Sequence, residues 1–77
     1  MTDVLLPILS LERPEAEGVV ATWFVTDGQV VTAGQLLAEI QVDKVSQEVP
    51  APADGVVHLL AAEGEAVAQG SAIARIS

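Results

Sequence analysis

The chain has 77 residues, of which 51% are hydrophobic, and its formal net charge is −8. It therefore forms one small domain, and its apolar content argues against disorder because burial can offset the entropy of ordering. The negative charge excludes nucleic acid and anionic membranes as partners and favours partners with basic surfaces. The lack of cysteine excludes disulfides, and the single histidine, His58, cannot hold a metal ion by itself.

The first residues, MTDVLLPILSLERPE, contain a short apolar run that Pro7 interrupts and that no basic leader precedes. This run matches neither a secretory signal peptide nor a membrane span. We expect a cytoplasmic protein that starts at Met1.

Short runs rich in β-branched residues alternate with Gly, Pro and Asp along the whole chain, and no segment shows a helical period. Strands are expected at 4–9, 18–25, 29–32, 36–42, 45–49, 55–61, 65–68 and 71–76. Short strands at this spacing, separated by turn residues, predict an all-β sandwich or barrel.

The chain also repeats itself. DGQVVTAGQLLAEI (27–40) aligns with EGEAVAQGSAIARI (63–76) at a shift of 36 residues, and EGVV (17–20) aligns with DGVV (54–57) at a shift of 37. The matched glycines indicate matched turns or close backbone approaches. We therefore predict a duplicated fold with internal pseudo-twofold symmetry, in which each half covers the apolar face of the other.

Alternating apolar and polar residues over 36–42 predict a strand with one apolar face. Placing Asp43 and Lys44 in a two-residue turn continues that face into the next strand and fixes the register. The expected pairs are Val42 with Val45, Ile40 with Gln47, and Ala38 with Val49. Gln47 must then find polar partners or lie at the rim. Asp-Lys is not a pair that favours a type I′ turn, so something other than turn chemistry selects it.

Lys44 is the only lysine in a chain with eleven carboxylates. A lysine at an exposed turn is usually a solubilising charge, yet a chain that used lysine for solubility would have more than one. An exposed amine is protonated at pH 7, and the neighbouring carboxylates of Asp43 and Glu48 favour the cation, so catalysis by a free amine is unfavourable. A unique amine at a rigid tip fits a residue that another enzyme modifies.

Segments from nearly the whole chain carry a family resemblance: LLPIL, EGVVATWFVTDGQVVTAGQLLAEIQVDKV, EVPAPADGVV and EGEAVAQGSAIARI. The most specific feature is Asp43-Lys44-Val45, midway between the two glycine-rich halves. It resembles a lipoyl domain of the dihydrolipoyl acyltransferase component of 2-oxo acid dehydrogenase complexes. The resemblance implies a flattened β-barrel of two four-stranded antiparallel sheets. The lysine would lie at a hairpin tip in one sheet, and both termini at the far end in the other.

The resemblance also implies a swinging-arm carrier without catalytic residues of its own. Lipoic acid would be attached to Lys44 as an amide by a lipoate ligase or lipoyl transferase, with Asp43 and Val45 as flanking recognition residues. A thiamine-diphosphate-dependent decarboxylase would acylate it reductively, an acyltransferase core would pass the acyl group to coenzyme A, and lipoamide dehydrogenase would reoxidise it. The chain would be a single carrier domain over 1–77, monomeric when isolated, and the N-terminal part of a longer acyltransferase.

Some positions depart from the family pattern. Gln41-Val42 stands where Glu-Thr is common. The segment SLERPEAEG (10–18) lacks the early glycine that is often found there. In the family this segment lies near the lysine tip and helps the decarboxylase recognise its carrier. The unusual loop leaves the identity of the decarboxylase open. The 2-oxo acid stays open as well, because lipoyl domains for pyruvate, 2-oxoglutarate, acetoin and branched-chain substrates overlap.

Two alternatives remain alongside the lipoyl interpretation. A biotinyl carrier domain shares the fold but has methionine on both sides of its lysine, where this chain has Asp43 and Val45. A docking module with an unmodified Lys44 is the second. An autonomous enzyme is disfavoured because the serines have only His58 as a base. Trp23 is expected to serve packing.

Overall fold

The computed structural model describes residues 1–77 and contains eight strands and no helix, hence none that could cross a membrane. The strands are β1 (Thr2–Leu5), β2 (Glu17–Trp23), β3 (Val30–Val31), β4 (Leu36–Val42), β5 (Val45–Pro50), β6 (Gly55–Leu59), β7 (Ala66–Ala68) and β8 (Ala72–Ile76). All eight predicted strands are present, seven of them with bounds within two residues. The predicted end of the first strand at residue 9 is wrong. That strand ends at Leu5, two residues before Pro7, which has no N–H to donate to a sheet.

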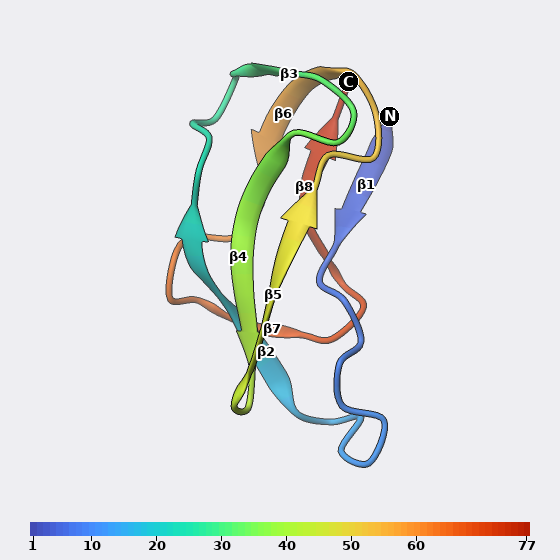
Figure 1. Ribbon diagram of the computed structural model, residues 1–77, viewed down its shortest axis with the longest axis vertical. Helices are drawn as coiled ribbons and strands as arrows, with labels where there is room; N and C mark the ends of the chain where they lie inside the picture. Colours follow the sequence, from blue (N-terminus) through green and yellow to red (C-terminus); the bar gives the residue numbers. More distant parts are fainter.

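The strands form two four-stranded antiparallel sheets, in the orders β1-β8-β6-β3 and β5-β4-β2-β7, and close into an elongated barrel (Figure 1). The predicted fold class is therefore confirmed. The two chain ends lie together at one end of the molecule, on the paired strands β1 and β8. The β4–β5 hairpin reaches to the opposite end, as the family resemblance implied (Figure 1).

The predicted pseudo-twofold symmetry is visible in the strand order. Exchanging β1 to β4 with β5 to β8 converts the order of one sheet into that of the other. Even the irregularities match, because Leu37 in β4 and Ile73 in β8 are each left unpaired by a β-bulge and are each fully buried. Each sheet takes two strands from each half, so the halves interlock instead of facing each other as separate sheets.

One apolar cluster of 17 buried residues fills the barrel, and no polar or charged residue is buried. All of its members are Val, Leu, Ile or Ala, as the composition indicated. The largest fully buried side chains are Leu6, Leu37, Ile40, Ile73, Val20, Val31, Val42 and Val57. Because they come from strands of both sheets and from the segment after β1, burial in this cluster holds the two sheets together.

The matched glycines occupy matched turns. Gly28 and Gly64 have φ of 87° and 80°, in the left-handed region that glycine adopts without strain. Each donates its N–H to a carbonyl of a strand in the other half, Gly28 to Val57 at 2.8 Å and Gly64 to Val20 at 3.0 Å. The sequence repeat therefore corresponds to a repeat of backbone hydrogen bonds.

We expect Ile40→Ala to lower the free energy of unfolding by about 2–5 kcal/mol, because the Ile40 side chain is fully buried in the centre of β4. Val30→Ala, at a side chain that is 72% exposed, should change it by less than about 0.5 kcal/mol. Urea denaturation measures both. Equal losses in the two variants would contradict the position of the core.

Candidate functional site

The β4–β5 hairpin has the predicted register. Val42 pairs with Val45, which leaves Asp43 and Lys44 as the two residues of the turn, and the other predicted pairs, Ile40 with Gln47 and Ala38 with Val49, are present. Gln47 is exposed at the rim, one of the two outcomes expected for it. Val45, predicted to continue the apolar face, is 51% exposed because the tip extends beyond the end of the core (Figure 1).

Asp43 is the residue of the turn that adopts an unfavourable backbone conformation. Asp43 has φ of 54° and is the only non-glycine residue of the chain with a positive φ, so Lys44 does not share the left-handed conformation that a type I′ turn requires of both residues. Aspartate enters this region more readily than most residues. The Gln41 side chain donates from Nε2 to the carbonyl oxygen of Asp43 at 3.1 Å, which supports the turn from the β4 side.

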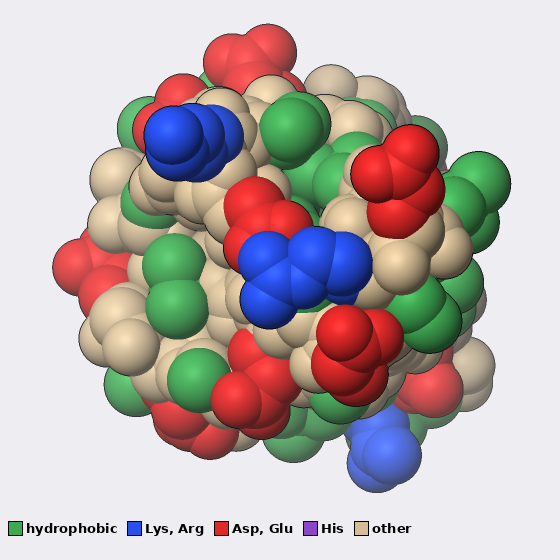
Figure 2. Space-filling model, turned by 90° about the horizontal axis from the view of Figure 1, so that it is seen from below, with side chains coloured by type: hydrophobic (Ala, Val, Ile, Leu, Met, Phe, Trp, Pro, Cys, Tyr) green, Lys and Arg blue, Asp and Glu red, His purple; other side chains and the backbone are tan.

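Lys44 itself is exposed and makes no hydrogen bond or ion pair. The other two basic side chains each face an aspartate: Arg13 Nη1 lies 3.5 Å from Asp43 Oδ1, and Arg75 Nε lies 3.2 Å from Asp3 Oδ1. Figure 2, which views the end that carries the tip, shows a basic side chain near its centre with acidic side chains on several sides of it. Among the lysine and arginine side chains, that of Lys44 is therefore the one without a carboxylate partner, and it is held on a turn of defined register.

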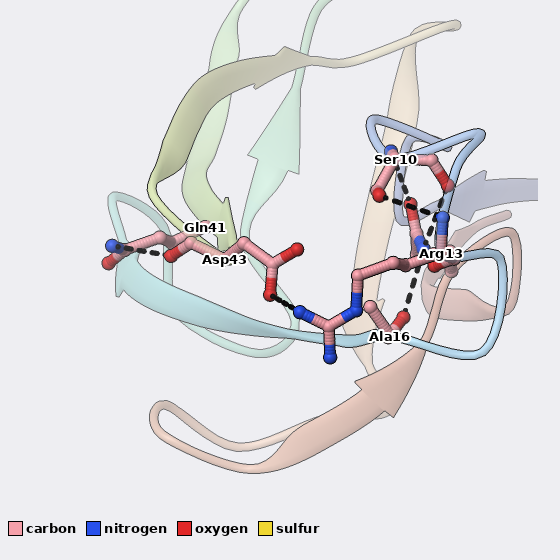
Figure 3. Close-up of polar contacts among 6 residues, drawn as sticks. Ser10, Arg13, Ala16, Gln41 and Asp43 are labelled. Atoms are coloured by element: carbon pink, nitrogen blue, oxygen red, sulfur yellow. Dashed lines mark hydrogen bonds and ion pairs between the residues drawn. The ribbon is translucent and has the colours of Figure 1, made fainter.

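The first loop, residues 6–16 between β1 and β2, lies beside this tip (Figure 3). The ion pair from Arg13 to Asp43 spans 30 residues of sequence and joins the loop to the turn. The expectation that this segment lies near the lysine is confirmed. No local sequence pattern could have paired Arg13 with Asp43, because the two residues are 30 positions apart.

Gly18 at the start of β2 allows the loop and the hairpin to approach each other. A Cβ at this position would lie 2.7 Å from Leu6 Cδ2 and 2.8 Å from Val42 Cγ2, far inside van der Waals contact. Gly18 pairs with Val42, the last residue before the turn. The matched glycines were expected to serve either turns or close backbone approaches, and Gly18 serves a close approach.

Two further candidates lie away from the tip. The His58 ring, on β6 of the other sheet, has Nε2 2.8 Å from the hydroxyl oxygen of Ser77 at the end of the chain. Trp23 packs against the core and donates from Nε1 to the carbonyl of Ala61 at 2.9 Å, as expected of a packing residue. Neither side chain belongs to the surroundings of Lys44.

Comparison with known proteins gives a consistent result. The family model Biotin_lipoyl, described as biotin-requiring enzyme, matches residues 11–76. A solved structure, the lipoyl domain of the 2-oxoglutarate dehydrogenase complex from Azotobacter vinelandii, matches with a TM-score of 0.80 at 33% identity and covers 100% of this chain and 96% of that one.

Two curated relatives are components of different complexes. The dihydrolipoyllysine-residue succinyltransferase component of the 2-oxoglutarate dehydrogenase complex of Escherichia coli K12 is 39% identical over 75 residues, which are 96% of this chain and 18% of that protein. The dihydrolipoyllysine-residue acetyltransferase component of the pyruvate dehydrogenase complex of Corynebacterium glutamicum is 38% identical over 76 residues, 97% of this chain and 11% of that protein. The chain thus spans less than a fifth of the length of either relative.

We expect Lys44→Arg to leave the free energy of unfolding within about 0.5 kcal/mol of the wild-type value, because the side chain is exposed and unpaired and the charge is kept. Urea denaturation with an unchanged m-value measures this. A loss comparable to that of a core substitution would show that the lysine supports the fold.

Proposed function

The chain belongs to the family of biotinyl and lipoyl carrier domains, and from this premise we propose that it carries lipoic acid as an amide on Lys44. The observation that supports this most strongly is the position of Lys44. It is the only lysine, it is exposed on a two-residue turn, and its amine has no carboxylate partner, whereas both arginines have one. A modifying enzyme can therefore reach it without breaking a contact of the fold.

The attachment chemistry requires little from the domain beyond presentation. The Lys44 amine, after giving up a proton, attacks the carboxyl carbon of lipoic acid that a ligase has activated with ATP. A C–N bond forms, and the activating group leaves with the electron pair of the C–O bond. The domain contributes the register that fixes the amine at the tip, with Asp43 and Val45 as the residues that flank it.

The residues beside Lys44 favour a lipoyl over a biotinyl group. Biotinyl carriers of this fold have methionine on both sides of the lysine, and this chain has Asp43 and Val45 there and no methionine except Met1. The relatives above are named for dihydrolipoyllysine, which agrees with the same choice. A biotinyl group, or a docking module with an unmodified lysine, is the alternative that the experiment below separates.

Once attached, lipoic acid supplies a dithiolane that takes up an acyl group on reduction and can be reoxidised after releasing it. We propose that the tip meets three partners in turn: a thiamine-diphosphate-dependent 2-oxo acid decarboxylase, the acyltransferase core that serves coenzyme A, and lipoamide dehydrogenase. The domain's own part is to keep the attached group tethered near each of them at high effective concentration.

The size of the relatives suggests where the domain belongs. Because the chain spans less than a fifth of their length, we propose that it is the N-terminal carrier domain of a longer, cytoplasmic acyltransferase whose catalysis lies in other domains. The relatives include both a succinyltransferase and an acetyltransferase. We therefore propose that the chain serves a 2-oxo acid dehydrogenase complex, without specifying which 2-oxo acid that complex uses.

We expect one lipoyl group, and no more, to attach to a side chain when the domain is incubated with lipoate ligase, lipoate and ATP. The intact mass should increase by one lipoyl amide, and by two further hydrogens on reduction. Since acylation removes the positive charge of Lys44, the formal net charge should change from −8 to −9, which a native gel measures.

Lys44→Arg is the matched control, because a guanidinium keeps the charge but cannot be acylated by this route. It should stay unmodified under the same conditions. Incubation with biotin ligase, biotin and ATP is the parallel arm. Efficient biotinylation without lipoylation would identify a biotinyl carrier, and a chain that neither ligase modifies would be the unmodified docking module.

A further inference from the structure

The first loop is held by one side chain from the opposite half of the chain. Gln69, in the turn between β7 and β8, accepts hydrogen bonds at Oε1 from the N–H groups of Leu9 and Ser10, both at 2.9 Å. Its Nε2 donates to the carbonyl oxygens of Ala16 at 3.0 Å, Arg13 at 3.1 Å and Ser10 at 3.5 Å. Two N–H donors on one side and carbonyl acceptors on the other fix the orientation of the amide.

These contacts hold the backbone of Arg13 in particular. Its N–H donates to the Ser10 hydroxyl at 3.3 Å, and its carbonyl accepts from the N–H of Ala16 at 2.9 Å as well as from Gln69. Both hydrogen-bonding groups of the Arg13 backbone are therefore occupied. This fixes the point from which its side chain extends to Asp43 (Figure 3).

The other half of the molecule has no such arrangement. There the equivalent loop, between β5 and β6, has only four residues (51–54), against eleven in the first loop (6–16). The position matched to Gln69 by the repeat is Ala33, whose backbone N–H donates to the Asp54 carboxylate at 2.7 Å. The Gln69 contacts thus belong to the longer loop, which lies at the tip end only.

The ion pair of Arg13 with Asp43 cannot order this loop by itself. Both side chains are open to solvent, with exposed fractions of 63% and 42%, and an exposed ion pair shifts an equilibrium constant by about fivefold at most. Fixing the backbone of a single residue lowers the equilibrium constant for ordering the loop by about tenfold. The loop must therefore be positioned by other contacts before the pair can form. Burial of Leu6 and Ala16 holds its two ends, and the hydrogen bonds of Gln69 hold the backbone between them.

We propose that Gln69 is a positioning residue for the modification of Lys44. It holds the first loop where Arg13 engages the carboxylate of Asp43, and that engagement directs the carboxylate toward the loop and leaves the adjacent lysine amine unpaired. The inference rests on the proposed function of Lys44 as the acceptor. Without the Gln69 contacts, the loop releases Asp43, and its carboxylate becomes free to pair with the amine that the ligase must reach.

The test uses Gln69→Leu, which keeps the size of the side chain and removes its hydrogen bonds. Gln35→Leu is the matched control, since Gln35 is also half-buried and accepts one bond from the Thr32 N–H at 3.1 Å, in a turn away from the tip. We expect amide hydrogen exchange at Leu9 and Ser10 to accelerate by about tenfold or more in Gln69→Leu and to stay unchanged in Gln35→Leu.

The second readout is the initial rate of lipoylation at limiting domain concentration, with lipoate ligase, lipoate and ATP. Gln69→Leu and Arg13→Gln should each lower this rate by about threefold, and the double variant should be no slower than either single variant, because both act through Asp43. Arg13→Lys should recover part of the rate. Arg13→Gln alters only an exposed side chain, so it tests the same step if Gln69→Leu fails to fold.

Faster exchange at Leu9 and Ser10 with an unchanged lipoylation rate would overturn the proposal, and so would losses that add in the double variant. If the wild-type chain accepted no lipoyl group, the proposed function would fail instead. The exchange rates would still show whether Gln69 holds the loop.

Discussion

The register of the β4–β5 hairpin is the constraint on which the rest of the structure depends. Ile40, Val42 and Val49 face the core from the two strands of the hairpin, and a slip of one residue would turn each of them to solvent. Burial of these side chains therefore fixes which two residues form the turn. Lys44 lies at the tip because the core leaves it no other position, although the lysine contributes nothing to the core itself.

The pseudo-twofold symmetry explains how so small a barrel can have one specialised end. The turn that carries Lys44 corresponds, in the other half, to the place where β8 and β1 meet and where the chain begins and ends. The two ends share strand order, bulges and turn glycines. They differ in the first loop, which is longer than its counterpart and lies against the tip, so the symmetric framework supports an asymmetric surface beside one lysine.

Much of this was predictable from sequence because it depends on local alternation and spacing. The hairpin register follows from the apolar phase of 36–42, and the turns follow from the glycine repeat. The contacts of Arg13 and Gln69 were not predictable, since they join residues 30 to 60 positions apart through hydrogen bonds that leave no periodic pattern. The end of β1 was wrong because hydropathy alone continued past Pro7, and Val45 is more exposed than its pattern implied because periodicity does not show where the core ends.

The central claim is that the tip lysine carries a lipoyl group in the cell. Peptide mass mapping of the protein recovered from its own organism tests this most directly. We expect the peptide containing Lys44 to carry a lipoyl amide on that residue, and no other side chain to carry the group. A peptide recovered only with a bare Lys44, or with biotin attached to it, would show that the lysine is not a lipoyl carrier.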